Sequence, residues 1–211
     1  MRAAAIALVV VVSLVACHAP APAPPPPRAL PARPRVAVLP FRVAEGAGAP
    51  DDAGAALARI LTRRLADSGV AVVESDVVLG AAQLADTGAY DARTAARVAR
   101  KVSANVAVLG TLARWRDRVG TAWAVQEPAS LAYQATLVNA ADAAVLREDH
   151  FDYTQQTLSS NLLDLPRFLR SGGRWLTVHE LADGALGETA SRFAAALGAR
   201  APSATGAGRT P

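Results

Sequence analysis

The spacing of apolar positions predicts strands and helices in alternation over the first half of the chain. Residues 35–41 are a short apolar run, rich in β-branched side chains and flanked by prolines, which indicates a buried strand. From Leu57 to Leu65, apolar side chains recur three and four positions apart, as on one face of a helix that Asp51 or Asp52 can cap. The further elements expected here are strands at 70–74 and 105–110, a short helix near 77–85, and a helix capped by Asp91. Strands that alternate with helices predict parallel pairing in a mixed sheet.

The second half of the chain changes to a period of two. Residues 131–140 and 144–153 alternate apolar and polar side chains across a short turn, which predicts an antiparallel hairpin. A helical region is expected near 159–170, and a closing helix over 178–197. The predicted order is β-α-β-α-β-β-β-α. We therefore expect an α/β (α+β) fold with two or three layers, in which the helices pack on a mixed sheet.

The N-terminus has the features of an exported protein. Arg2 precedes an apolar run over 3–15, which is too short for a permanent membrane helix of about 20 residues and is typical of a secretory signal. The residues Leu14-Val15-Ala16-Cys17 resemble a lipobox, where a lipoprotein signal peptidase cuts before a lipid-bearing cysteine. This resemblance predicts removal of 1–16 and a membrane anchor of acyl chains, such as palmitate, on Cys17. A plain cleaved signal with an incidental cysteine is the alternative.

Proline dominates the segment that follows this cysteine. Eight of the eighteen residues from Cys17 to Pro34 are proline, which fixes φ and lacks an N–H donor, so helix and sheet are excluded there. We expect an extended spacer of about 3.1 Å per residue, on the order of 50 Å in all, or else a tail without a selected length. The expected divisions are a signal peptide at 1–16, a lipidated linker at 17–34, a periplasmic domain at 35–198, and a disordered tail at 199–211.

Three short stretches resemble a known class of cell-envelope domain. These are Val-Ala-Val-Leu-Pro-Phe at 36–41, the pair of elements ending in Val-Val-Glu at 72–74, and Asn-Val-Ala-Val-Leu-Gly at 105–110 before a hairpin. Together they resemble the periplasmic α/β domain of the curli secretion channel lipoprotein (CsgG-like), of the lipoprotein activators of penicillin-binding proteins, and of the N-terminal part of TolB. Residues 118–133 and 175–181 also resemble lipoproteins of uncharacterised activity with this domain.

The resemblance implies a bacterial outer-membrane lipoprotein. His18 follows the lipidated cysteine where Asp, by analogy with well-studied Gram-negative lipoproteins, would retain the protein at the inner membrane, so we expect the outer membrane and its periplasmic face. A curli-type pore is not expected, because the candidate inserts at 115–130 and 154–177 carry charges and lack the apolar stripe of a membrane-spanning hairpin.

The chain offers little that points to catalysis or metal binding. Cys17 is the only cysteine and is consumed by lipid, and no Gly-x-Ser-x-Gly, phosphate-loop or dinucleotide motif is present. His150 lies on a predicted edge strand among acidic residues, which favours a solvated face over an acid–base site. His179-Glu180 begins like a zinc-protease motif, but Asp183 stands where the second histidine belongs. We therefore expect no enzyme activity, no catalytic residue, no metal and no cofactor.

Two arginine-rich stretches are candidate binding surfaces. The helix after Asp91 has basic residues on one side, which suit either a solvated face or an anionic lipid or glycan: Arg93, Arg97, Arg100 and Lys101. Residues 112–130 combine arginine with tryptophan, and both are enriched at protein interfaces. As an extended arm or loop, this stretch is the preferred partner contact, unless its tryptophans fold back over the sheet. The contact residues expected are Arg114, Arg116, Arg118, Trp123 and Glu127.

The composition limits which classes of partner and function we expect. The formal charge of +4 is mild for 211 residues, and a basic patch would have to be clustered to indicate a nucleic-acid partner, so we expect no nucleic acid. The expected function is a lipid-anchored periplasmic domain, non-enzymatic, that assists an envelope protein complex. Activation of a peptidoglycan synthase is one alternative, which the long spacer would serve, and an envelope enzyme or glycan-binding protein is another.

Overall fold

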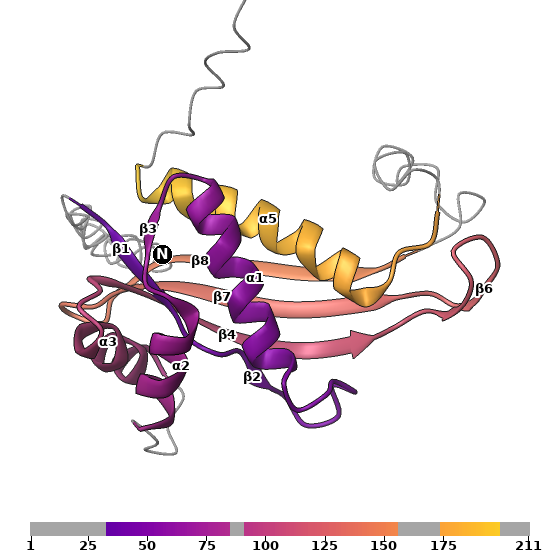
Figure 1. Cartoon of the computed structure of the whole chain (residues 1–211), viewed down its shortest axis with the longest axis horizontal. Coiled ribbons are helices and arrows are strands. Elements are labelled where there is room, and N and C mark those ends of the chain that lie inside the picture. The colour runs from indigo at the N-terminus through magenta and orange to yellow at the C-terminus, as the bar shows by residue number, and fades with distance from the viewer. Residues whose placement is uncertain (1–32, 85–90, 156–173, 199–211) are drawn as a thin grey trace, which may run out of the picture.

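The computed structural model of the chain describes residues 33–84, 91–155 and 174–198. In chain order the elements are β1 (Arg35–Val38), β2 (Arg42–Val43), α1 (Ala53–Asp67), β3 (Ala71–Val72), α2 (Ser75–Gln83), α3 (Ala92–Lys101), β4 (Val106–Arg116), β5 (Val119–Gly120), β6 (Val125–Glu127), β7 (Ser130–Asn139), β8 (Val145–Thr154) and α5 (Val178–Ala196). Six strands form one sheet in the order β3-β1-β4-β7-β8, with β2 paired to β4 farther along that strand (Figure 1). Strands β5 and β6 form a separate two-stranded hairpin.

The sheet is mixed, as the pattern of the sequence predicts. Strand β1 runs parallel to β3 and to β4, with Val36 opposite Val106 and Val38 opposite Val108. Strands β7 and β8 form the expected antiparallel hairpin, and β7 also pairs antiparallel with β4. The predicted α/β fold with helices packed on a mixed sheet is confirmed.

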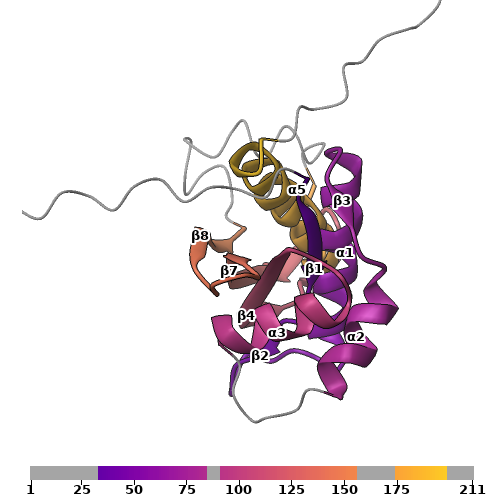
Figure 2. The ribbon, with the colours of Figure 1, turned by 90° about the vertical axis from the view of Figure 1, so that its left-hand side faces the viewer.

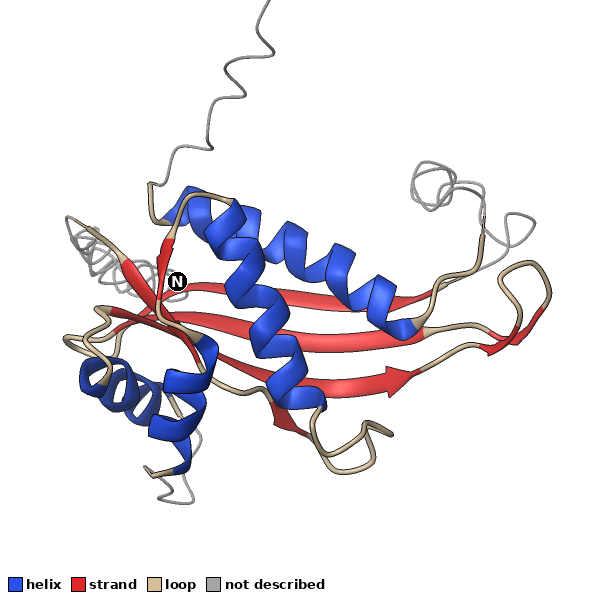
Figure 3. Cartoon of the chain, in the orientation of Figure 1, coloured by secondary structure: helices blue, strands red, loops and turns tan. Residues whose placement is uncertain are grey.

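The two faces of the sheet are covered to different extents. Helices α1 and α5 lie together on one face, where their apolar side chains pack against Val38, Val108 and Leu137 (Figure 3). Helices α2 and α3 pack on the other face against Ala37, Ala107 and other small side chains, at the end of the sheet where the described chain begins (Figures 1 and 2). The fold therefore has three layers at that end and two layers along the rest of β4, β7 and β8.

Two glycines allow the close packing of α1 against the sheet. A Cβ atom on Gly54 would lie 2.0 Å from the carbonyl oxygen of Phe41, and the Phe41 amide donates a 3.0 Å hydrogen bond to the Gly54 carbonyl. A Cβ atom on Gly110 of β4 would meet the Phe41 ring at 2.3 Å. Only hydrogen at these positions lets the Phe41 ring enter the core and meet Tyr133 edge-on, with 6.0 Å between ring centroids.

A chain of polar groups crosses the apolar core under α5. The Tyr133 hydroxyl lies 2.8 Å from the Thr189 hydroxyl, which in turn donates to the Asp149 carboxylate. Arg192 donates to the same carboxylate at 2.9 Å. Burial raises the pKa of the Tyr133 hydroxyl well above its usual value, so this group stays protonated and can donate or accept within the chain. The network fixes α5 on β7 and β8.

The structure corrects several predicted boundaries. Strand β4 does not end at Gly110 but continues to Arg116, so the first part of the stretch expected as an arm belongs to the sheet. The short strands β2, β5 and β6 are absent from the predicted order. Asp52 holds the N-cap position of α1 without a side-chain capping bond, whereas Asp91 caps α3 by accepting from the Thr94 amide at 2.8 Å, as predicted. The helical region near 159–170 lies outside the described residues.

Candidate functional site

A small hairpin extends from the far end of the long strands. We call residues 117–128, which include β5, β6 and the turn between them, the distal hairpin (Figure 1). Its turn is held by Thr121, whose amide donates to the Ala124 carbonyl at 2.9 Å and whose hydroxyl accepts from the amides of Ala124 and Trp123. Gly120 has a φ of 113° and brings the turn so close to Ala124 that a Cβ atom would lie 2.4 Å from the Ala124 carbonyl oxygen.

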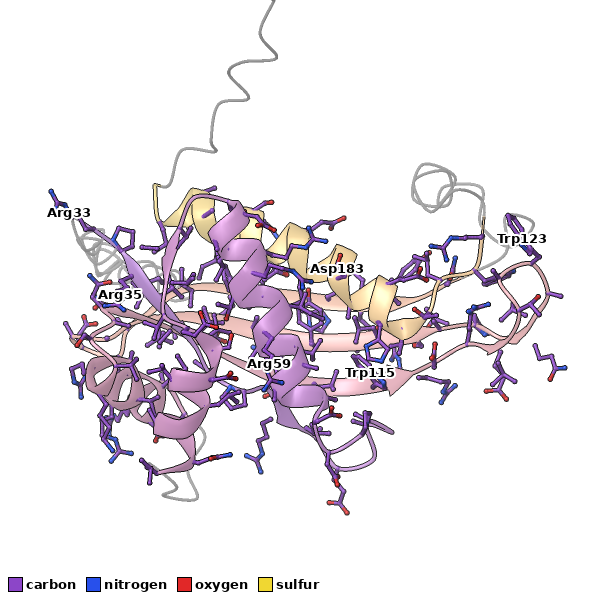
Figure 4. The ribbon with its side chains drawn as sticks, viewed as in Figure 1. Arg33, Arg35, Arg59, Trp115, Trp123 and Asp183 are labelled. Carbon is purple, nitrogen blue, oxygen red and sulfur yellow. The ribbon has the colours of Figure 1, made fainter. Side chains whose placement is uncertain are left out.

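The turn presents a large apolar side chain to solvent. Trp123 is 75% exposed, and Val119 on β5 is 48% exposed. In Figure 4, Trp123 and Arg33, the first described residue, lie at opposite ends of the long axis of the domain. Trp123 is therefore presented on the side away from the point where the chain enters the domain.

The segment before α5 fastens the distal hairpin to the body of the domain. The Trp175 amide donates to the Ala122 carbonyl at 2.9 Å. Gln155, which is 4% exposed, accepts from the Leu176 amide at 2.8 Å and donates to the Arg174 carbonyl at 3.1 Å. Because Gln155 directly follows β8, its side chain connects this segment to the sheet.

The N-terminus of α5 supplies a second attachment. The Asp117 carboxylate accepts from the Val178 amide in the first turn of α5 at 2.9 Å, and a carboxylate at this position is favoured by the helix dipole. Thr177 and Glu180 form a reciprocal capping box at the same helix end. The distal hairpin thus begins at the helix terminus that it helps to cap.

Arg174 completes the cap through a two-point ion pair with Glu180. The two nitrogen–oxygen distances are 3.0 and 2.6 Å. Hydrogen bonds from Arg174, followed by one from the Thr177 amide, lower the pKa of the Glu180 carboxyl to about 2. The ion pair also raises the pKa of the Arg174 guanidinium. Both groups keep their charges throughout the neutral range.

The two tryptophans of the predicted contact stretch have different environments. Trp115 is 6% exposed, and its ring meets the His179 ring edge-on with 4.9 Å between centroids. It therefore belongs to the core beneath the first turn of α5, as the alternative reading of this stretch anticipates. Trp123, by contrast, does not fold back over the sheet.

The five predicted contact residues lie on two neighbouring elements. Arg114 and Arg116 are on β4, and the Arg114 guanidinium is held by the Ser130 hydroxyl and by Asp152 within the sheet. Arg118 and Glu127 are on the distal hairpin with Trp123, and Arg118 donates a long 3.4 Å bond to the Gly120 carbonyl. The structure therefore brings three of the five together. Whether they contact a partner stays a prediction.

The remaining candidates from the sequence lie apart from the distal hairpin. His150 is exposed on β8, the last strand of the described sheet, while its neighbour Asp149 faces α5 on the opposite side. Within the described ranges, no group of three His, Cys, Asp or Glu side chains is arranged as metal ligands would be. Cys17 lies outside the described residues. No helix of residues 33–84, 91–155 or 174–198 combines the length and apolar character that a bilayer span requires.

Sequence reasoning missed the residues that brace the distal hairpin. The Thr177-x-x-Glu180 spacing is a readable capping-box signal. Gln155 and Asp117 give no such signal. Gln155 bonds to backbone groups 19 and 21 positions away, and Asp117 bonds to a backbone amide 61 positions away. Only the fold makes these contacts apparent.

No protein-family model matches the chain, and no curated protein matches its sequence. Several solved structures have a similar arrangement. The PelC dodecamer from Paraburkholderia phytofirmans is 16% identical, covers 78% of this chain and 93% of its own, and has a TM-score of 0.47. Lipoprotein GNA1162 from Neisseria meningitidis is 14% identical over 66% of this chain and 94% of its own (TM-score 0.46). The C-terminal domain of LpoB from Escherichia coli is 15% identical over 58% and 83% (TM-score 0.41). At these levels of similarity, function must be argued from the residues of this chain.

Proposed function

We propose that this chain is a lipid-anchored, non-enzymatic interaction domain that assists an envelope protein complex through its distal hairpin. In this proposal Cys17 carries the lipid, the spacer at 17–34 lifts the domain from the outer membrane, and the domain works on the periplasmic side. The observation that carries the contact is the exposure of Trp123 on a turn that the rest of the fold holds in place.

An exposed tryptophan on a fixed turn is suited to protein recognition. Tryptophan buries a large apolar area on binding and loses little side-chain freedom, and it is among the residues that most often dominate binding energy. The bonds from Trp175, Gln155 and Asp117 limit the movement of the distal hairpin before a partner arrives. A pre-formed contact has less conformational entropy to lose on association.

The position of the distal hairpin fits a domain tethered at its N-terminus. The chain enters at Arg33, at the opposite end of the long strands from Trp123 (Figure 4). A partner in the periplasm can therefore reach Trp123 without passing between the domain and its anchor.

The test is site-specific photo-crosslinking in the cell of origin. A photoreactive phenylalanine replaces Trp123 in one variant and Leu84, an 86% exposed apolar residue at the end of α2, in the control. We expect one envelope protein to crosslink from position 123 and not from position 84. Equal products from both positions, or none from position 123, would overturn the proposed contact.

The identity of the crosslinked protein separates the alternatives. A transpeptidase would favour activation of a peptidoglycan synthase, whereas a secretion or assembly component would exclude it.

For the enzyme or glycan-binding alternative, His150 and Asp152 are both changed to Ala. If this variant restores every phenotype of a deletion strain, that alternative falls.

The anchor is tested separately through Cys17. The Cys17→Ser variant should lose incorporation of labelled palmitate and leave the membrane fraction, while Ser68→Ala should retain both. Retention of the label in Cys17→Ser would contradict lipidation at this residue.

A further inference from the structure

A second feature lies at the opposite end of the domain from the distal hairpin. An open pocket of about 550 Å³ lies between α3 and the turn that joins β7 to β8. A single buried water needs only about 10–15 Å³ of such volume, so the pocket has room for a much larger group. The turn contributes Ala141, Asp142 and Ala143 to its wall.

Three arginines of α3 line this pocket. Arg93, Arg97 and Arg100 follow one another at spacings of four and three residues, which places them on one side of the helix. The Arg100 guanidinium donates one bond to the Ala140 carbonyl at the base of the turn, which fixes its position. A guanidinium has five N–H donors in a planar fork that matches the oxygens of a phosphate group.

The two carboxylates of the pocket are turned toward backbone amides. Asp91 accepts from the Thr94 amide at 2.8 Å as the cap of α3, and this bond is the main reason why the pKa of Asp91 lies below its usual value. Asp142 accepts from the Ala144 amide at 3.1 Å within the turn. Arg97 also donates to the Thr94 hydroxyl at 3.0 Å. With three arginines and two carboxylates, the lining keeps one formal positive charge in excess.

We propose that this pocket binds the phosphate group of an anionic monoester or diester, with Arg93, Arg97 and Arg100 as its ligands. The group can come from a phospholipid headgroup or from a soluble phosphate. Helix α3 lies at the end of the domain where the chain enters, facing the viewer in Figure 2. If Cys17 carries lipid, as proposed above, this is the end nearest to the anchor. Binding of phosphate itself does not depend on the lipid or on the distal hairpin.

The experiment uses the purified full chain in a non-ionic detergent. Inorganic phosphate is titrated against sodium chloride at constant ionic strength, and micelles doped with phosphatidylglycerol are compared with micelles doped with phosphatidylcholine. The thermal midpoint and the hydrogen exchange of peptides over 91–102 and 139–145 are measured. A variant with all three pocket arginines changed to Gln is compared with a charge-matched control. In the control, three arginines outside the pocket are changed to Gln instead: Arg42, Arg59 and Arg147.

We expect phosphate to raise the midpoint and to slow exchange in both peptides for the wild type and the control. The pocket variant should bind at least tenfold more weakly. An effect of both inorganic phosphate and phosphatidylglycerol assigns the site to a headgroup as well as to free phosphate, whereas an effect of inorganic phosphate alone assigns it to a soluble compound. No effect of either probe, or equal responses of the pocket variant and the control, would overturn the proposal.

A single change guards against loss of folding in the triple variant. Arg93 is exposed, and its replacement by Gln removes a pocket donor without removing a bond of the α3 cap. Arg93→Gln should fold as the wild type does and weaken phosphate binding at least threefold. Unchanged binding in this folded variant would also count against the site.

Discussion

Replacement of Gln155 by Leu tests whether the distal hairpin is braced by the side chain that follows β8. The substitution nearly keeps the volume but removes both bonds, one from the Leu176 amide and one to the Arg174 carbonyl. A neutral hydrogen bond contributes about 1 kcal/mol net, so the expected loss is about 2 kcal/mol. For a domain of this size that corresponds to a lower thermal midpoint by about 4–8 °C.

The loss should also be local. A difference of about 2 kcal/mol in local opening makes amide exchange about 25-fold faster, and this acceleration should appear over 174–180 before it appears in β7. Hydrogen exchange with mass spectrometry measures the local opening, and urea unfolding measures the loss in the free energy of unfolding. The matched control is Gln134→Leu, the same change at an exposed position of β7, which should alter stability by no more than about 0.5 kcal/mol. If the two variants have equal midpoints and equal exchange over 174–180, then Gln155 does not brace this segment.

Three further predictions concern the packing and the charges of the fold. Gly54→Ala should lower the free energy of unfolding in urea by about 3 kcal/mol, because the added carbon meets a backbone oxygen. Gly184→Ala, where an added carbon has no atom within 4 Å, should raise it by up to about 1 kcal/mol. A Gly54→Ala variant more stable than Gly184→Ala would contradict this packing. The pKa of Glu180 falls from 4.5 in the unfolded chain to about 2 in the folded domain, so its contribution to stability is complete above about pH 4.5 and is lost as the pH falls toward 2. In Glu180→Gln, the free energy of unfolding should therefore change less with pH between these values. An unchanged dependence on pH would argue against the ion pair. Tyr133→Phe should cost about 1 kcal/mol by removing the bond to Thr189, and an unchanged urea midpoint would show that this bond adds nothing.

The periodic parts of the fold could be predicted from the sequence, for physical reasons. The run at 36–39 is apolar throughout because β1 is covered on both faces. In β7, Leu131, Tyr133, Ala135 and Leu137 recur with a period of two because they share the face under α5. These patterns arise from local burial, so they are visible in the residues themselves.

The far end of β4 could not be predicted in the same way. A bulge between Leu112 and Arg114 changes the register, so Leu112 and Trp115 face the core although they are three positions apart. Without knowledge of this bulge, the arginines on either side of Trp115 make the sequence of this strand look like an exposed arm. Asp149 is one of the acidic residues beside His150, where the sequence predicts a solvated face, but its partner Thr189 lies 40 positions away, and only tertiary packing brings the two together.

The parallel pairing of β1 with β4 has a mechanical consequence. Asn105 clamps the start of β1 through bonds of 2.8 Å to the Arg35 amide and the Arg33 carbonyl. A force that pulls the N-terminus toward an anchor, and the distal hairpin toward a bound partner, acts on β1 and β4 in opposite directions along their common axis. The hydrogen bonds between these strands are then loaded in shear and must break together, whereas a perpendicular force would open them one at a time. A domain held at both ends would therefore resist extension along the line that joins its anchor to its partner.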